Sequence, residues 1–293
     1  MREKTFKTEG GIINYAEGPS SGPPLILLHG IPGRWQEFLP IIPDLMFSYH
    51  LYALDLRGQG KSSRTAGQYH SKTYGKDIVA FLCDEIEEPA ILFGMSAGGL
   101  VALDAVAQAS DKVKTVILGD SPIDFKWLKT WMKSDEFMNL FSTFRDLAGS
   151  DKSLAQMLKD LGEVPVQIPG ETEPIRYADQ PGVDAIDLLQ FAKTLSMLDP
   201  GVLDYHAEGR VDEYLEGFEL EEMLHNLTCP VLLVQGNPSL GGMMTNQSVE
   251  YALAELPDAT HVLIEGAGHG LGLDTWEVNH LLRVISGFLE ALN

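Results

Sequence analysis

Residues 94–98 read Gly94-Met95-Ser96-Ala97-Gly98, and this stretch decides the fold. Four apolar residues precede it at 90–93, and a helix-like apolar run follows it at 100–107. The pattern predicts a buried strand, a very tight turn and a helix, with the serine in the turn. A side chain at either glycine would collide, because strand and helix pass so close together. The hydroxyl is expected at the carboxyl end of a sheet, over a helix N-terminus whose dipole favours negative charge.

Strands and helices alternate on both sides of this turn. Several runs, such as residues 25–28, are apolar on both faces, as central parallel strands are. Strands are predicted at 10–16, 25–28, 50–54, 90–93, 113–119, 231–235 and 261–264, and helices at 35–46, 71–87, 100–107, 249–256 and 275–292. This alternation predicts an α/β fold, with a mostly parallel central sheet and helices on both faces.

The alternation stops after residue 122. Residues 123–225 contain no convincing buried strand, but they carry helix-like stretches rich in large apolar side chains. A proline-containing part at 161–180 reads as a loop. We therefore predict a helical cap, residues 123–226, inserted between two parts of one core, residues 1–122 and 227–293.

Composition limits the partners. The chain has 293 residues, 44% of them hydrophobic, and its 42 acidic and 21 basic residues give a formal net charge of -21. Such a surface argues against nucleic acid and anionic membranes, and weakly disfavours a strongly anionic substrate. Cys83 and Cys229 fall in predicted core elements, which indicates buried free thiols. No segment is typical of a signal peptide or membrane span, so we expect a cytoplasmic protein; the sequence does not indicate an oligomeric state.

Gly-x-Ser-x-Gly between a strand and a helix is a nucleophile elbow, which makes Ser96 the candidate nucleophile. A serine hydroxyl needs a base to take its proton. His269 is the best-placed histidine, in a glycine-rich loop at 266–270 that follows the last predicted strand. That loop lies at the end of the sheet where ligands bind.

An oxyanion needs backbone N–H donors that are in place before the charge develops. We predict the amide of Ala97, directly after the nucleophile, as one donor. The amide of Ile31, in the loop after the strand at 25–28, is predicted as the other. His29 is expected to shape that loop as a structural histidine.

Four segments together resemble the α/β-hydrolase fold superfamily: HGIPG at 29–33, DLRGQGKS at 55–62, GMSAGG at 94–99 and GAGH at 266–269. The likeness is to its capped branch of esterases, carbon–carbon bond hydrolases, lactonases, epoxide hydrolases and haloalkane dehalogenases. Ser96 stands where the last two carry an aspartate, which argues against both chemistries. The resemblance also implies that the loop carrying Asp55 and Arg57 braces the oxyanion loop, and that Arg57 pairs with a nearby carboxylate.

One departure concerns the acid that orients the histidine. Most of the family carries it in the loop after the strand at 231–235, but residues 236–244 hold no carboxylate. We predict Asp120, at the end of the strand at 113–119, where some members carry their acid, and Asp124 as the second choice. Weaker candidates are Glu265, Asp274 (a predicted N-cap of the final helix) and the neutral Asn237 and Ser239.

The resemblance implies a serine hydrolase that cleaves a small to medium carboxylic ester or lactone through an acyl-enzyme. Alternatives are a carbon–carbon bond hydrolase on a β-diketone-like substrate and a poorly catalytic ligand-binding receptor, which the missing carboxylate favours. The predicted pocket residues are Trp35, Met95, Trp127 and Trp131, although packing between cap and core explains the tryptophans equally well. No cluster has metal-ligand spacing and no glycine run has a nucleotide-binding pattern, so we expect no metal and no cofactor.

Overall fold

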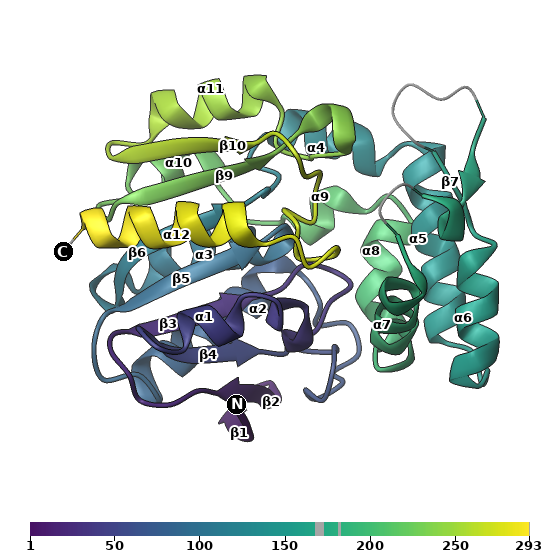
Figure 1. The fold of residues 1–293 in the computed structure, drawn as a ribbon, viewed down its shortest axis with the longest axis horizontal. Helices are drawn as coiled ribbons and strands as arrows, with labels where there is room; N and C mark the ends of the chain where they lie inside the picture. Colours follow the sequence, from purple (N-terminus) through teal and green to yellow (C-terminus); the bar gives the residue numbers. More distant parts are fainter. Residues whose placement is uncertain (168–172, 181–182, 293) are drawn as a thin grey trace.

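A computed structural model describes residues 1–167, 173–180 and 183–292. Within them, the core is one eight-stranded sheet in the order β1-β2-β4-β3-β5-β6-β9-β10 (Figure 1). The strands are β1 (Arg2–Thr8), β2 (Gly11–Glu17), β3 (Pro24–Leu28), β4 (His50–Leu54), β5 (Ala90–Met95), β6 (Val113–Gly119), β9 (Val231–Gly236) and β10 (Ala259–Ile264). Strand β2 pairs antiparallel with both β1 and β4. The six strands β4, β3, β5, β6, β9 and β10 run parallel to one another. The predicted α/β fold class is confirmed.

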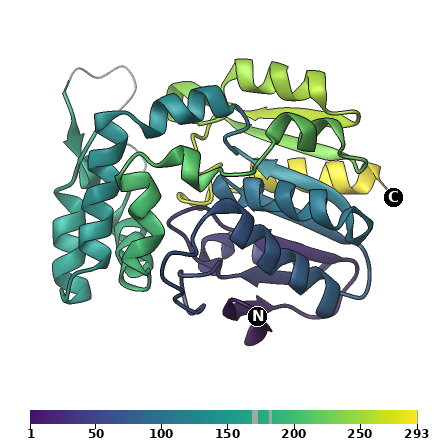
Figure 2. The same cartoon turned by 180° about the vertical axis from the view of Figure 1, so that it is seen from behind.

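Helices cover both faces of the sheet because each buries one apolar stripe. In α12, Leu281, Ile285 and Leu289 recur every four residues and are buried. One face carries α1 (Ile42–Leu45) and α12 (Asn279–Ala291), and the other carries α2 (Ser71–Asp84), α3 (Ala97–Gln108), α10 (Leu220–His225) and α11 (Asn246–Glu255) (Figure 2). The sheet therefore separates two hydrophobic clusters.

A group of helices lies between β6 and β9 in the chain and beyond one end of the sheet (Figure 1). Its elements are α4 (Phe125–Met132), α5 (Asp135–Ala148), α6 (Leu154–Gly162), α7 (Ala185–Ser196), α8 (Asp204–Ala207) and α9 (Val211–Tyr214), with the two-residue strands β7 (Pro165–Val166) and β8 (Ile175–Arg176). Ring contacts among Phe137, Phe141, Phe144 and Phe191 hold α5 and α7 together. We call this group the cap helices.

Three sequence predictions of local structure need correction. The predicted helix at 35–46 is a 3-10 turn, η1 (Trp35–Phe38), and the short α1, because Pro40 lacks the N–H that a continuous helix requires. The final helix starts at Asn279, with Val278 and not Asp274 at its N-cap. Strand β1 was not predicted, since most of its side chains are exposed and polar, as at a sheet edge.

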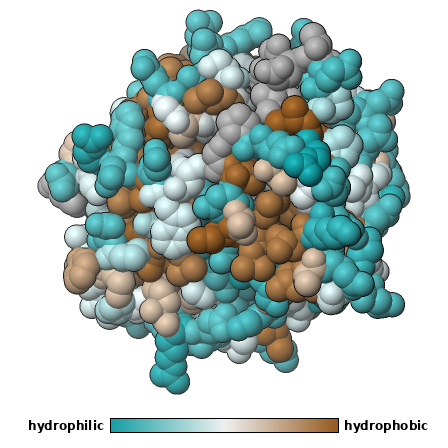
Figure 3. All heavy atoms as spheres, turned by 45° about the vertical axis from the view of Figure 1, so that its right-hand side comes forward, coloured by the Kyte–Doolittle hydropathy of each residue, from teal (hydrophilic) through white to brown (hydrophobic). Residues whose placement is uncertain are grey.

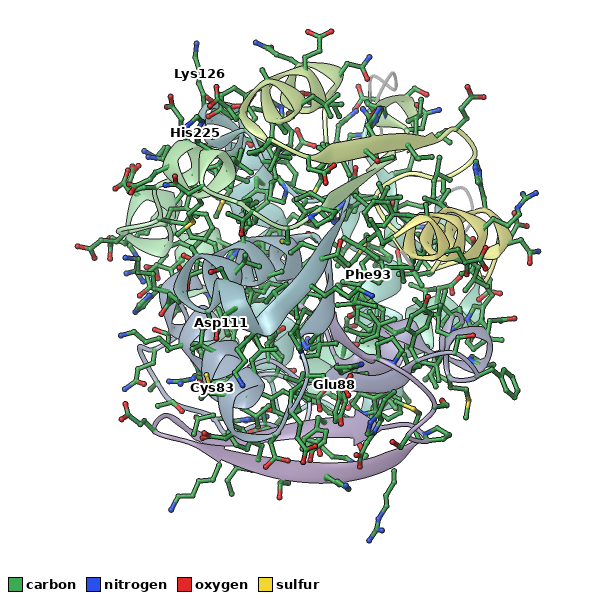
Figure 4. The ribbon with its side chains drawn as sticks, turned by 90° about the vertical axis from the view of Figure 1, so that its left-hand side faces the viewer. Cys83, Glu88, Phe93, Asp111, Lys126 and His225 are labelled. Atoms are coloured by element: carbon green, nitrogen blue, oxygen red, sulfur yellow. The ribbon has the colours of Figure 1, made fainter. Side chains whose placement is uncertain are left out.

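The two cysteines also differ from expectation. Cys229 is buried, as predicted, but Cys83 is exposed. Cys83 lies in the last turn of α2, near the end of the sheet that faces away from the cap helices (Figure 4). The sequence predicted the helix correctly but the burial of Cys83 wrongly, because Cys83 lies on the solvent side of α2.

The described ranges were also searched for membrane spans. They contain no helix with the length and apolar character needed to cross a bilayer.

Gly98→Ala tests the close approach that the turn requires. A Cβ at residue 98 would lie 2.2 Å from the carbonyl oxygen of Leu28. Because that oxygen belongs to the central strand β3, it cannot move aside, and we expect a loss of roughly 3 kcal/mol or more of stability. Thermal melts and soluble yield measure the effect.

Gly287→Ala is the matched control for Gly98→Ala. It is also a helical glycine, but its Cβ would meet nothing within 4 Å. The change should stabilise α12 by about 0.5–1 kcal/mol. If both variants melt like the wild type, the steric argument is wrong.

Candidate active site

Ser96 occupies the turn between β5 and α3 in a strained conformation. Its φ of 54° and ψ of -125° lie outside the regions that L-residues favour. Its N–H donates to Gly119 O at 2.8 Å, and its side chain does not cap α3. A Cβ at Gly94 would lie 2.3 Å from Gly98 O, so the collision predicted at both glycines is confirmed. The fold thus holds the hydroxyl clear of the helix backbone.

The loop at 29–33 lies directly against Ser96. A Cβ on Gly30 would be 3.0 Å from Ser96 Cβ and 3.5 Å from Ser96 Oγ. Neither the Ile31 amide nor the Ala97 amide donates a hydrogen bond within the part of the chain that the structure describes. Two backbone donors therefore remain unused, one in the loop that contacts Ser96 and one directly after Ser96.

His29 fixes the shape of this loop from within. It is fully buried, its Nδ1–H donates to Gly30 O at 2.7 Å, and its Nε2 accepts the Leu56 N–H at 3.0 Å. This pattern assigns the neutral tautomer. Burial lowers the pKa of His29, which keeps the ring uncharged.

The segment after β4 braces the loop from outside. Asp55 Oδ1 accepts the Trp35 N–H at 2.8 Å, and Gln59 Oε1 accepts the Gly33 N–H at 2.8 Å. Arg57 makes a two-pronged pair with Asp77, Nε to Oδ2 at 2.9 Å and Nη2 to Oδ1 at 2.7 Å. Asp55 and Gln59 therefore hold the backbone next to the loop in place, and Arg57 pairs with a nearby carboxylate, as the family resemblance implies.

His269 and Asp120 meet at the carboxyl end of the sheet. His269 Nδ1 donates to Asp120 Oδ2 at 2.7 Å. Asp120 directly follows β6, is fully buried and has a φ of 40°. Because Nδ1 carries the proton in this bond, the neutral imidazole keeps Nε2 free to accept one.

The loop after β9 supplies donors to Asp120. The N–H groups of Gly236, Met243 and Met244 donate to the Asp120 carboxylate at 2.9, 2.6 and 3.1 Å. A buried carboxylate requires such partners. The loop without an acid of its own therefore wraps around the acid contributed by β6.

The other acid candidates are engaged elsewhere. Asp124 accepts the Trp127 N–H at 3.0 Å and caps α4. Asn237 accepts from both the N–H and the Oγ of Ser239 and donates to Glu265 O at 2.8 Å. Asp274 lies against Gly270, where a Cβ would approach its carboxylate to 2.3 Å. None of them forms a hydrogen bond with His269 in the described ranges.

The four predicted pocket residues lie in two places. Trp35 and Met95 are buried in the cluster on the α1 and α12 face, and Trp35 Nε1 donates to Glu3 at 3.1 Å. Trp127 and Trp131 are half-buried on α4 and stack with ring centroids 5.2 Å apart. Packing explains the position of Trp35, whereas the α4 pair belongs to the cap helices.

Two residues were missed by sequence reasoning, Glu37 in η1 and Arg34 at its N-cap. Arg34 is 7% exposed, and its Nε donates to Thr194 Oγ1 at 3.1 Å. Glu37 accepts the Arg34 N–H at 3.1 Å, and burial raises the pKa of Glu37 to about 8. No local motif marks either residue. The side-chain partners of Arg34 lie in the cap helices, and the raised pKa of Glu37 results from its burial in the folded chain.

Metal ligands were also sought among the described residues. They contain no group of three or more His, Cys, Asp or Glu side chains arranged to hold a metal ion.

Comparison with known proteins gives a consistent result. A family model described as alpha/beta hydrolase fold matches residues 23–274. The chain is 26% identical to 2-(acetamidomethylene)succinate hydrolase of Mesorhizobium japonicum over 274 residues, 92% of this chain and 89% of the relative. It is 26% identical to pimeloyl-[acyl-carrier protein] methyl ester esterase of Aliivibrio salmonicida, over 87% and 88% of the two chains. The structure of Est816, an N-acyl homoserine lactone degrading enzyme, superposes with a TM-score of 0.72 at 18% identity, covering 97% of this chain and 100% of that one.

Glu37→Gln tests the buried carboxyl. With a raised pKa, the folded chain retains a proton that the unfolded chain releases above about pH 4.3. The site's contribution to stability is therefore fully present below that pH and is lost as the pH rises through about 8. Glutamine keeps the oxygen that accepts from Arg34 but does not titrate, so we expect a melting temperature a few degrees above wild type at pH 8 and near wild type at pH 4.5.

The measurement is a series of thermal melts between pH 4.5 and 8.5. Glu88→Gln, at an exposed site on the opposite end of the sheet (Figure 4), is the control and should show no such pH-dependent gain. A constant difference between Glu37→Gln and wild type at every pH would contradict the prediction.

Proposed function

This chain belongs to the α/β-hydrolase family, and we propose that it is a serine hydrolase cleaving a small to medium carboxylic ester or lactone. The observation that carries the proposal is the 2.7 Å bond between Asp120 and His269, formed at the same end of the sheet as the strained Ser96. A base oriented by a buried acid is what a serine hydroxyl needs to become a nucleophile.

In the proposed reaction, Ser96 Oγ attacks the carbonyl carbon while His269 Nε2 takes its proton. The amides of Ile31 and Ala97 hold the oxyanion of the tetrahedral intermediate. The intermediate collapses as His269 donates the proton to the leaving alkoxide, which departs as the alcohol and leaves an acyl-enzyme. Water, deprotonated by His269, then attacks the acyl carbon and releases the acid and Ser96. Asp120 stabilises the imidazolium in both halves.

Several features support an apolar small-molecule substrate. The cap helices carry the aromatic side chains named above, and we propose that Trp127, Trp131 and Met95 contribute to the pocket wall beneath a cap formed by residues 123–226. Apolar residues gather in the middle of the face shown in Figure 3, with hydrophilic residues around them. By their names, the relatives include an ester hydrolase and a lactone-degrading enzyme. The cytoplasm is the compartment that we propose from the sequence.

The receptor alternative loses its main support. It was favoured by the absence of a carboxylate from residues 236–244, and Asp120 supplies one from β6. The carbon–carbon hydrolase alternative uses the same three side chains. Assays of β-diketones beside short-chain esters separate it from ester hydrolysis.

Ser96→Ala should abolish turnover of p-nitrophenyl esters and covalent labelling by a fluorophosphonate, while the melting temperature stays near that of the wild type. The reason is that only the attacking oxygen is removed. Steady-state rates and intact-protein mass measure the two effects. Retained turnover in the variant would rule out this mechanism.

Asp120→Asn and Asp124→Asn form a matched pair for the acid. Asparagine at 120 would place an NH₂ among N–H donors and leave His269 without its anion, so we expect kcat to fall by about 10³–10⁴-fold. Asparagine at 124 remains a good N-cap, and activity should stay within about twofold. Activity of Asp120→Asn equal to that of Asp124→Asn would exclude Asp120 as the acid.

A further inference from the structure

Arg34 is a buried cation without a carboxylate partner. Among the described residues its guanidinium donates to two neutral groups alone, Thr194 Oγ1 at 3.1 Å and Gln190 Oε1, both on α7. Its Nη1 makes no hydrogen bond within the described ranges. Arg57, which is equally buried, has a bidentate carboxylate partner in Asp77. The chain has 42 acidic residues that could have paired with it. A buried charge without such a partner lowers stability, so we looked for a ligand that it could bind.

The nearest carboxyl groups do not hydrogen-bond the guanidinium of Arg34. Glu37 accepts the backbone N–H of Arg34, and with its pKa raised to about 8 by burial it is mostly protonated at neutral pH. The oxygens of Asp55 accept from the Trp35 N–H, the Lys61 N–H and the Asn14 side chain, so Asp55 attracts the guanidinium only through space. A carboxylate in direct contact with the guanidinium is therefore not supplied by either residue.

A second unused donor lies beside the same loop. Gln59 is fully buried, and because its Oε1 accepts the Gly33 N–H, the orientation of the amide is fixed. Its Nε2 is buried and has no hydrogen-bond partner in the part of the chain that the structure describes. Gly33 directly precedes Arg34, so a buried cation and a buried amide lie on the same turn of chain, and each has a nitrogen, Arg34 Nη1 and Gln59 Nε2, without an acceptor in the described ranges.

This turn lies between Ser96 and the cap helices. Arg34 is four residues after Gly30, which lies against Ser96, and four residues of chain span at most about 14 Å. The contacts with Thr194 and Gln190 place the guanidinium where the core meets α7. The chain from Gly30 to Arg34 thus connects the residue beside Ser96 with a guanidinium that contacts α7.

We propose that Arg34, assisted by Gln59, binds a carboxylate of the substrate, so that the natural substrate is an ester or lactone carrying an ionised acid group. This inference rests on the proposed hydrolase function. A planar guanidinium pairs bidentately with carboxylate, and a primary amide adds a further N–H donor. The net charge of -21 acts over the whole surface and slows approach of anions, whereas Arg34 acts at contact and selects a monoanion once it has entered.

The test compares esters with and without this charge, and the effect of Arg34 is the change in their ratio between wild type and variant. The probes are the mono-p-nitrophenyl ester of adipic acid and its neutral methyl ester, with a second pair, 4-(butanoyloxy)benzoate and phenyl butanoate, that puts the acid on the alcohol side. We expect wild type to prefer the acid in at least one pair. Arg34→Gln should reduce that preference in kcat/KM by about 10- to 100-fold, mainly through KM, and Arg34→Lys should restore part of it.

Two controls separate recognition from structure. Arg145→Gln removes one positive charge from α5, where Arg145 pairs with Asp204 and Glu208, and should leave the preference unchanged. Thr194→Val removes a contact with the cap helices but keeps the cation, and should also retain the preference. An equal loss on acid and neutral esters in Arg34→Gln would make Arg34 a structural anchor and overturn the proposal, as would the absence of any preference in wild type.

A binding measurement keeps the inference testable if hydrolysis fails. If wild type cleaves neither ester and Ser96 resists the fluorophosphonate, the proposed function falls. Calorimetry of adipate with wild type and Arg34→Gln then decides the inference separately. Binding that disappears in Arg34→Gln supports the carboxylate site, and no binding to wild type overturns it.

Discussion

The hydrogen-bonded carboxylate of Asp120 is the interaction on which the site depends. It is fully buried and accepts from three backbone N–H groups of the loop after β9 and from His269 Nδ1. A buried anion is tolerated only when such donors surround it. The same four hydrogen bonds that stabilise the charge also connect the chain segments at the ends of β6, β9 and β10. The interactions that stabilise the buried carboxylate therefore also position the imidazole of His269.

Backbone strain gathers at the same end of the sheet. Ser96 and Asp120 both have positive φ, and each directly follows one of two neighbouring parallel strands. Their N–H groups donate to Gly119 O and Val234 O, which fixes both turns to the sheet. Strain of this kind persists only where the surroundings determine the conformation. Rigid strands therefore allow two unfavourable turns to present a hydroxyl and a carboxylate.

The sequence predicts the sheet well because parallel strands are apolar on both faces and stand out from their neighbours. It predicts less where the outcome depends on a partner. The edge strand β1 has mostly polar, exposed side chains, so its sequence lacks the apolar pattern of a buried strand. The stretch at 35–46 has a helix-like apolar pattern, but Pro40 lacks the backbone N–H that a continuous helix needs. Arg34 and Glu37 have no local sequence signal, because Arg34 is distinguished by its contact with α7 and Glu37 by a pKa that burial raises.

The sequence by itself determined the turn at Ser96 and the order of elements around it. Close backbone packing requires glycine at fixed positions next to the serine, and this pattern can be recognised in the sequence. Ser96, His269 and the loop at 29–33 could be named for that reason. Only the tertiary structure decided how Asp120 is used and what surrounds it, because its partners come from residues more than a hundred positions away. It also decided that Arg34 would be buried against α7 without an anion, since burial and charge balance are properties of the assembled fold and not of any segment.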